Sequence, residues 1–319
     1  MNIKSLLLGS AAALAAVSGA QAADAIVAAE PEPMEYVRVC DAFGTGYFYI
    51  PGTETCLQIG GWVRFQVDFG RNQSGSSDWD ATGRAYLTTT AKSDTELGTL
   101  TSFIAVEADW DGSGPVEPGP GANSVYIDEA YLQLGGFKAG YFYSWWDKGI
   151  NGETDVNGNV TQFVSAAYIY EGDSFSAGIS VDELEGINAD TAVVGLDGTP
   201  DSDATNGLGV AGIVSASFGA VSADLLGGYD TESEDGAIRG LISADIGPGT
   251  LQVLGVYASG VNAYWAASEW SVAASYKINA TETLSITPAV QYFSDRNFDG
   301  AGSPDSWKYG VTVGYKITT

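Results

Sequence analysis

Two cysteines are the first residues whose chemistry the sequence defines. Cys40 and Cys56 are the only cysteines of the chain. In an exported protein, the oxidising compartment favours their pairing. Closing a loop of this length stabilises the folded state by roughly 3 kcal/mol. We therefore expect a disulfide, with two separately buried thiols as the alternative.

Charged side chains offer a second chemistry, the attraction and repulsion of ions. The chain has 40 acidic and 13 basic residues, a net charge of −27 and no histidine. Without histidine a Ser-His-Asp triad is impossible and the commonest metal ligand is missing. Such an acidic chain is also an implausible partner for nucleic acid. We expect no enzymatic activity and no cofactor.

One segment imitates a metal site. Asp295–Gly300 copies the first half of a calcium-binding loop, but its twelfth position is Ser306 where glutamate is needed. We interpret it as an ordinary loop rich in Asp and Gly, and expect no metal.

The first residues have the form of a secretory signal peptide. Lys4 precedes an apolar run from Leu6 to Val17, and the small-residue pattern Ala20–Ala22 follows. No later stretch reaches the roughly 18 apolar residues that a transmembrane helix requires. We expect residues 1–22 to be removed, residues 23–35 to form a flexible leader, and residues 36–319 to form the folded domain.

Many segments alternate between apolar and polar residues, the spacing of a β-strand with two unlike faces. From Leu57 to Gly70 the odd positions are apolar, as at Val63 and Phe65. Polar residues such as Arg64 and Asp68 occupy the even positions. The segments 269–278, 284–292 and 307–317 repeat the pattern. Nothing else in the chain is available to cover so many apolar faces, since helical segments are missing.

About fourteen such strands, joined alternately by short turns and longer polar loops, are typical of a membrane barrel with lipid outside and water inside. Closure is required, because an open edge in hydrocarbon leaves backbone groups unpaired. We predict an all-β, antiparallel transmembrane β-barrel in the bacterial outer membrane, in contact with its lipid and lipopolysaccharide. Residues 36–50 can bring the strand count to 16, an even number.

The connections fall into two classes. Short turns are expected at 91–96, 135–136, 171–173, 219–220, 247–249 and 279–280. Long loops are expected on the outside of the cell at 111–123, 145–160, 182–207 and 294–306. Tryptophans near strand ends suggest an aromatic girdle, with packing beneath the loops as the alternative; they are Trp79, Trp110, Trp145, Trp146, Trp265 and Trp307.

Three blocks of sequence carry a family resemblance. They are VRVCDAFGTGYFYIPGTETCLQIGGWVRF (37–65), GRAYLTTTAKSDTELGTL (83–100) and YIDEAYLQLGGFKAGYFYSWWD (126–147). In these blocks the chain resembles the general porins of alphaproteobacteria. The resemblance implies a 16-stranded barrel, a homotrimer, and a third loop folded inward to narrow the pore.

That third loop corresponds to Trp145–Val160, which follows the strand ending at Tyr143. We predict that its acids face basic residues of the barrel wall and create a transverse field. The predicted constriction comprises Arg64, Arg84, Lys92, Glu107 and Asp109 on the wall, and Asp147, Glu153 and Asp155 on the loop. The alternative is that Arg64 and Arg84 pair with the loop and simply hold it in place.

These features predict passive diffusion of small hydrophilic solutes and ions, with a modest preference for cations. Two alternatives remain open. A substrate-specific channel, for example for sugars, is suggested by the aromatic run Tyr141–Trp146, and a structural or adhesive surface barrel would use the same strands.

Overall fold

The computed structural model describes residues 38–74, 77–111, 117–118, 123–184, 207–298 and 304–318. The chain divides into two units, residues 1–38 and 39–319. The predicted signal peptide (1–22) and leader (23–35) lie outside the described residues, as does most of the loop predicted at 182–207. None of the helices in the described ranges is long and apolar enough to cross a membrane.

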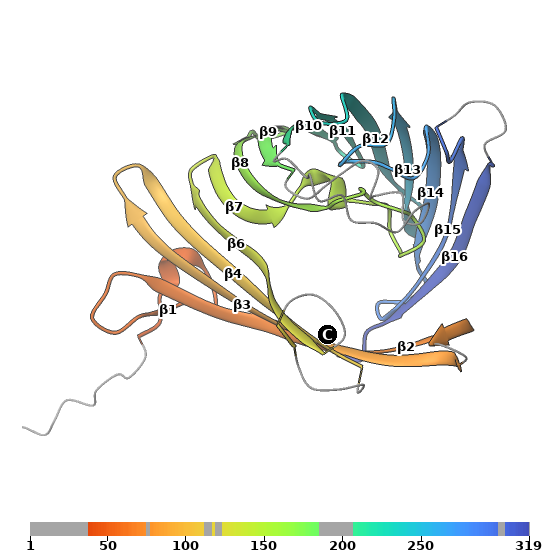
Figure 1. The fold of residues 1–319 in the computed structure, drawn as a ribbon. Helices are drawn as coiled ribbons and strands as arrows, with labels where there is room; N and C mark the ends of the chain where they lie inside the picture. The colour runs from red at the N-terminus through yellow and green to blue at the C-terminus, as the bar shows by residue number, and fades with distance from the viewer. Residues whose placement is uncertain are drawn as a thin grey trace, which may run out of the picture. The chain divides into compact units, whose positions relative to one another are not determined.

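The unit 39–319 is built on one sheet, in which strands that follow each other in the chain pair antiparallel (Figure 1). β5 (Glu117–Pro118) lies off this path and pairs parallel with β6. Besides the strands, the described residues contain two 3-10 turns, η1 (Asp41–Phe43) and η2 (Trp145–Asp147). The other strands are β1 (Phe48–Tyr49), β2 (Cys56–Ser74), β3 (Ser77–Thr95), β4 (Gly98–Trp110), β6 (Ser124–Leu134), β7 (Phe137–Tyr143), β8 (Gln162–Glu171), β9 (Phe175–Glu183), β10 (Leu208–Phe218), β11 (Val221–Asp230), β12 (Asp235–Ile246), β13 (Gly249–Ala258), β14 (Trp270–Asn279), β15 (Leu284–Ser294) and β16 (Ser306–Tyr315).

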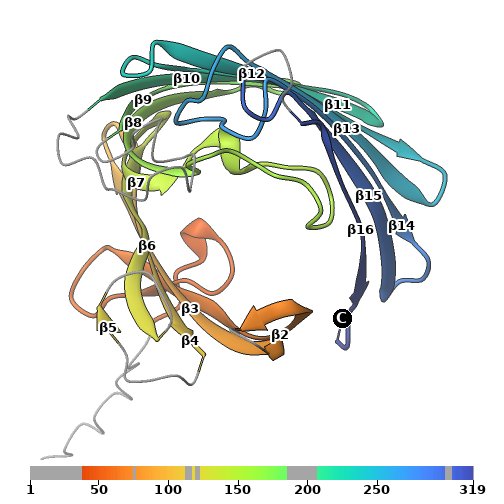
Figure 2. The same cartoon turned by 45° about the vertical axis from the view of Figure 1, so that its right-hand side comes forward.

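The pairing register assigns each side chain to one of two faces. Arg64 pairs with Arg84, and Arg84 pairs with Asp109, so these three residues share the face that we call the inner face. Figure 2 shows the strands following one another around a curved wall, with the segment between β7 and β8 on its concave side. The predicted all-β, antiparallel architecture is confirmed.

The opposite, outer face is apolar and open. Phe65 is 75% exposed and Tyr309 82% exposed, and similar side chains recur on the other strands. Soluble proteins rarely expose such a large continuous apolar surface to water. A hydrocarbon surrounding accounts for it, as the alternation in the sequence predicts.

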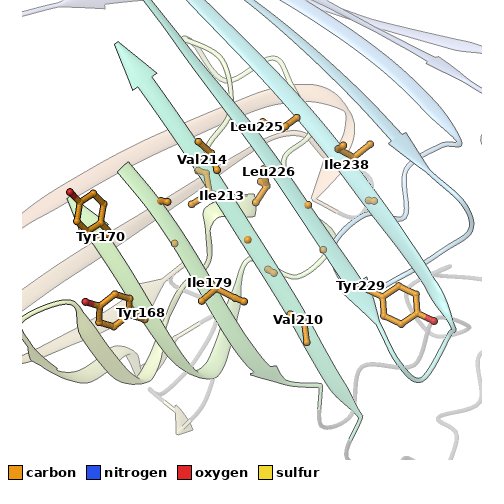
Figure 3. A pocket seen from close by; sticks show the side chains of 17 residues that line it. Tyr168, Tyr170, Ile179, Val210, Ile213, Val214, Leu225, Leu226, Tyr229 and Ile238 are labelled. Atoms are coloured by element: carbon orange, nitrogen blue, oxygen red, sulfur yellow. The ribbon is translucent and has the colours of Figure 1, made fainter. Parts of the chain in front are cut away.

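A shallow apolar hollow of about 790 Å³ interrupts the outer face across β8 to β12 (Figure 3). Gly212 of β10 and Gly227 of β11, which pair with each other, line the hollow and contribute no side chain to fill it. Tyr168, Tyr170 and Tyr229 are among the larger residues that line it.

The inner face differs from its prediction in β10 to β13. A polar inner face was expected on all strands, but Leu226, Leu241, Leu254 and Val256 point inward and are buried. They belong to a hydrophobic cluster that also contains Trp146, Tyr264 and Trp265, which lie in connections between strands. The expectation is wrong here because loops, rather than water, cover this part of the wall.

The predicted turn at 91–96 is also placed wrongly. β3 continues to Thr95, which pairs with Gly98, and the turn is formed by residues 96–97. The pairing of β3 with β4 extends the strand through a polar sequence that resembles a turn.

The sheet begins at β1, whose Phe48 also forms an isolated bridge with Val39, and it ends at β16. β1 pairs with β2 at only two positions, and within the described residues no pairing joins β16 to β1 or β2. The sheet has 15 strands along its antiparallel path and 16 when β5 is included, close to the predicted number. Closure of the barrel stays a prediction.

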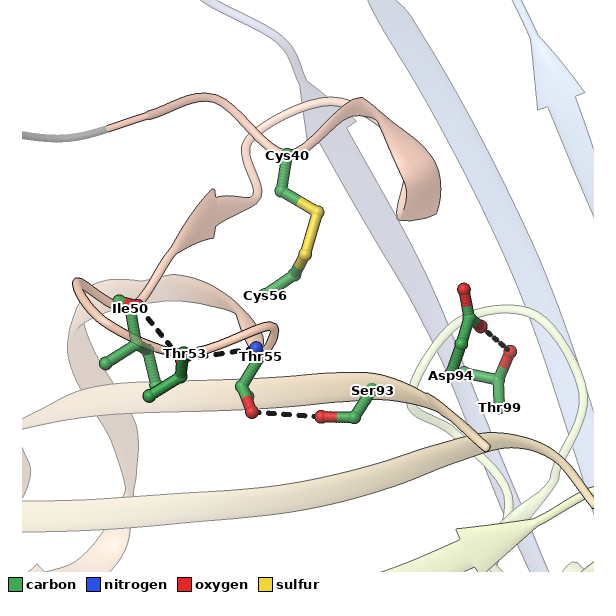
Figure 4. The surroundings of a disulfide bond; sticks show 8 residues. All are labelled: Cys40, Ile50, Thr53, Thr55, Cys56, Ser93, Asp94 and Thr99. Carbon is green, nitrogen blue, oxygen red and sulfur yellow. Dashed lines mark hydrogen bonds between the residues drawn. A yellow bond between two sulfur atoms is a disulfide. The ribbon is translucent and has the colours of Figure 1, made fainter. Parts of the chain in front are cut away.

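The predicted disulfide is confirmed. Cys40 and Cys56 are bonded, with their Cα atoms 6.0 Å apart, and both are buried (Figure 4). Tyr47 is buried beside them and Phe43 packs against the cluster. The bond fastens the segment before β1 to the first residue of β2.

Candidate functional site

The segment between β7 and β8, residues 144–161, is the third connection at its end of the strands, counted from the β2–β3 hairpin, and we call it loop 3. Its two ends are joined, because Ser144 N donates to Thr161 O at 2.7 Å. The Ser144 hydroxyl accepts from Trp146 N at 3.2 Å and caps η2. The chain therefore turns sharply out of β7 and starts loop 3 in a fixed direction.

Loop 3 lies against the inner faces of β11 to β16. Lys148 Nζ contacts Asp224 of β11 at 2.5 Å. Further along, the amide of Val156 donates to Gln291 Oε1 of β15 at 2.7 Å. Backbone amides of the loop also reach Gln252 of β13 (2.5 Å) and Thr312 of β16 (3.4 Å). Contacts with strands so far apart in sequence mean that the loop crosses the interior.

A buried arginine that the sequence analysis missed holds the start of loop 3. Arg239 of β12 is 3% exposed and donates to the carbonyls of Trp145 (2.7 Å) and Trp146 (3.0 Å). Its guanidinium also lies 5.0 Å from the centre of the Trp146 ring. Alternation alone would place Arg239 on the inner face, but nothing in the sequence pairs it with a loop some 90 residues earlier.

The predicted basic wall is neutralised by acids of its own strands. Arg84 Nε lies 2.5 Å from Glu107 Oε1 and 2.6 Å from Asp109 Oδ1, both on β4. Glu107 is almost fully buried and also accepts from Tyr126 Oη at 2.6 Å. Arg84 is thus paired with acids of β4, the neighbouring strand of the wall.

Arg64 and Lys92 occupy different places on the same wall. Arg64 is exposed and helps to line a polar cleft of about 390 Å³ with Asp80, Arg84 and Asp109. Lys92 instead lies at the other end of β3, where its Nζ is 5.5 Å from the ring of Tyr47 in the cluster around the disulfide. The structure thus brings Arg64, Arg84 and Asp109 together and places Lys92 with the aromatic rings.

A second polar group on this wall was not predicted. Asp128 of β6 is buried and accepts from Tyr86 Oη (2.9 Å), Tyr143 Oη (3.0 Å) and Gln162 Nε2 (3.1 Å). Asp128 sits at a β-bulge, where its strand has one residue more than β4. A bulge shifts the alternation, which is why the pattern gave no signal.

The three predicted acids of loop 3 have different surroundings. Glu153 is exposed, while the Asp155 carboxylate accepts from the amide of Ile150 at 2.9 Å and closes a turn within the loop. Asp147 is half-buried, and burial raises the pKa of its carboxyl above the ordinary aspartate value. Arg239 opposes this rise in pKa through its charge.

The tryptophans divide between the two interpretations offered by the sequence. Trp79, Trp110 and Trp307 are exposed, as a membrane girdle requires. Trp146 and Trp265 are fully buried beneath loops, so the girdle is the wrong interpretation for these two. Phe142 is buried as well, which removes part of the aromatic run 141–146 from any solute path.

Comparisons with known proteins agree with this geometry. A family model described as a porin subfamily matches residues 24–319. A Sinorhizobium fredii protein named as an outer membrane protein, y4fJ, is 58% identical over 100% of this chain and 90% of its own length. Porin Omp2b of Brucella canis is 41% identical over 77% of this chain and 66% of its own length.

Among solved structures, the outer membrane channel DcaP of Acinetobacter baumannii aligns with a TM-score of 0.62, over 85% of this chain and 89% of that chain. Its sequence identity of 13% means that this likeness concerns the fold alone.

The strands, their outward apolar face and the family match define a bacterial outer-membrane channel of the β-barrel class. The chain belongs to the porin subfamily. It is therefore a passive channel of the outer membrane rather than an enzyme.

Proposed function

We propose that the protein is a water-filled, modestly cation-selective porin for small hydrophilic solutes and ions, with loop 3 as its constriction. The observation that supports this most is the course of loop 3 along the inner faces of β11 to β16. A segment fixed there leaves the inner face of β2 to β7 as the polar side of the passage.

The charge of that polar side supports cation preference. Arg84 is neutralised by Glu107 and Asp109, and Arg64 shares its cleft with Asp80. Glu153 adds an exposed acid from the loop. A unit charge 10 Å from a passing ion contributes only about 0.4 kcal/mol in bulk water, but several such charges in a confined lumen add up.

Liposome swelling with sugars of graded size tests the pore. We expect uptake of small sugars and a size limit above which swelling ceases. Absence of uptake for even the smallest sugar would contradict the proposal.

Planar-bilayer recordings under a salt gradient test the selectivity. We expect a reversal potential of the sign that cation preference gives, reduced at high salt because charges are screened over about 8 Å already at physiological ionic strength. A reversal potential of the opposite sign would sink the cation preference and leave the pore intact.

The remaining parts of the proposal concern processing and assembly. We propose that residues 1–22 are removed, since they precede the family match that starts at residue 24, and that residues 23–35 form a flexible leader. We propose a homotrimer whose outward faces contact outer-membrane lipid and lipopolysaccharide. Cross-linking in native membranes, followed by electrophoresis, checks for three copies.

A further inference from the structure

A second connection is folded into the interior, and neither the sequence pattern nor the family match assigns it a role. Residues 259–269 join β13 to β14, and we call them loop 6. Loops normally run over the surface. In loop 6, however, Asn262, Ala263, Tyr264 and Trp265 have no solvent-exposed surface at all.

Loop 6 has a fixed internal structure. The Asn262 side-chain oxygen accepts from the amides of Tyr264 and Trp265, both at 3.0 Å. Trp265 Nε1 donates to Ser268 O at 2.7 Å. The Ala263 amide donates to the buried carboxylate of Asp230, at the end of β11, at 3.0 Å. These bonds satisfy the buried polar groups and define one conformation.

Tyr264 occupies a slot in the inner wall. A Cβ atom added to Gly228 of β11 would lie 2.6 Å from the Tyr264 ring, and one added to Gly209 of β10 would overlap its hydroxyl. That hydroxyl donates to Asp182 of β9 at 2.7 Å. Phe163 flanks the ring at a centroid distance of 5.5 Å. The two glycines leave the space that the side chain fills.

The carboxylate of Asp182 is buried and accepts further hydrogen bonds besides the one from Tyr264. It is 1% exposed and also accepts from the hydroxyls of Ser165 (2.6 Å) and Ser180 (3.1 Å). A buried carboxylate without such donors would be costly. Burial and the neighbouring Asp182 raise the pKa of the Tyr264 hydroxyl, so it remains a donor throughout the physiological range.

The backbone of loop 6 is joined directly to loop 3. Asn159 N donates to Tyr264 O and Val160 N donates to Ala263 O, each at 3.0 Å. The Asn159 side chain adds a bond to Asn262 O at 3.1 Å. The Trp146 ring of loop 3 also packs against Tyr264, at a centroid distance of 5.9 Å.

From these contacts we propose that Tyr264 is a positioning residue of the pore: seated between Gly209 and Gly228, it holds loop 6 against the returning limb of loop 3 and so fixes the width of the passage. The inference rests on the proposed role of loop 3 as the constriction. It adds that the constriction is held from the wall at β9 to β11 through a second loop.

Two adjacent glycines provide a matched test. Gly228→Ala pushes a methyl group into the Tyr264 ring, whereas a methyl group at Gly227 points outward and meets only Ala237 O at 3.9 Å. In planar bilayers we expect Gly228→Ala and Tyr264→Ala to increase open-channel current noise about twofold, since loop 3 loses its support. Gly227→Ala should match the unmodified protein. Heat-dependent electrophoretic mobility shows that each barrel is folded.

A double variant separates the slot from general damage. In the Tyr264→Ala background the ring is gone, so Gly228→Ala should add nothing further to the noise. This background also relieves the clash if Gly228→Ala alone does not fold. Additive effects of the two substitutions would overturn the inference.

Deletion of residues 150–156 tells the two proposals apart. If the deletion raises conductance while Gly228→Ala behaves as Gly227→Ala does, loop 3 is the constriction and Tyr264 does not position it. If the deletion leaves conductance unchanged, the constriction itself is overturned, and this inference with it.

Discussion

The inner wall of this porin has two halves, one polar and open and the other apolar and covered by loops. From β2 to β7 polar side chains pair between neighbouring strands, as Arg84 does with Glu107 and Asp109, and they line an open cleft. From β10 to β13 apolar residues such as Leu226 and Leu254 are buried beneath loops 3 and 6. One barrel wall therefore serves as a pore lining on one side and as a conventional protein core on the other.

This difference explains how the constriction that we propose for loop 3 can be held in place. Backbone loops in the middle of a water-filled lumen have few partners and would move. Here the loops acquire a dry hydrophobic cluster that includes Trp146 and Tyr264, together with hydrogen bonds to strand side chains. The covered half holds the loops, and the open half is the side on which we propose that solutes pass.

The largest expected effect is on the free energy of unfolding, and it compares one arginine in each half of the inner wall. Arg239→Met removes a buried donor from two loop carbonyls, and we expect it to lower the free energy of unfolding by about 3 kcal/mol. Arg64→Met, at an exposed position, should change it little. Urea titration of folded barrels in detergent measures both. Equal losses would mean that the two halves are not energetically distinct.

A smaller effect is expected on selectivity. Glu107→Gln with Asp109→Asn leaves Arg84 without its acids. We expect the ratio of cation to anion permeability to fall about fourfold for each charge removed, because about 0.4 kcal/mol acts on the cation and on the anion with opposite sign. Asp224→Asn, which removes an acid from the covered half, is the matched control. Reversal potentials measure the ratio, and a similar fall in the control would contradict the division of labour.

Acidification provides a third comparison. Burial raises the pKa of Asp147, so its carboxyl takes up a proton at a higher pH than an ordinary aspartate does. The loop's contribution to cation selectivity should therefore begin to fall before the exposed acids titrate. Because the folded-state pKa is raised, the associated stability is greatest at low pH and is lost as pH rises through it. Reversal potentials as a function of pH should lose this early step in Asp147→Asn.

The smallest expected effect on stability concerns Lys148, the second basic residue at the contact between loop 3 and the wall. Lys148 pairs with Asp224, but its side chain is 56% exposed. Exposed ion pairs contribute about 0.2–1 kcal/mol at most. Lys148→Met should therefore leave the urea midpoint nearly unchanged. A loss as large as that of Arg239→Met would show that burial is not what distinguishes the two contacts.

Sequence patterns predicted the parts of this molecule that depend on local alternation. The faces of β2 and β14 to β16, the disulfide and the inward charges Arg84 and Glu107 follow from period-two spacing or cysteine chemistry. Arg239 and Tyr264 could not be assigned this way, because their partners are brought together only when loops fold back on distant strands. Asp128 was lost to a bulge, which breaks the spacing that the argument uses.

The apolar inner faces of β10 to β13 also could not be predicted from alternation. With apolar residues on both faces, these strands lack the contrast by which a lumen is recognised. Loop 6 contains the apolar sequence Ala263-Tyr264-Trp265, which is unusual in a connection between strands and is complementary to these apolar inner faces. Together, the apolar inner faces and the apolar loop indicate a loop that folds inside the wall.

The lengths of β2 and β3 have a consequence beyond transport. Each has 19 residues, and at about 3.4 Å per residue such a strand is about 65 Å long, against a hydrocarbon layer of about 30 Å. β4 accompanies β3 only as far as Gly83, which pairs with Trp110. The β2–β3 hairpin thus extends past β4 at the end of the sheet from which loop 3 starts, and this overhang is too long to lie within the hydrocarbon layer together with the rest of the strand.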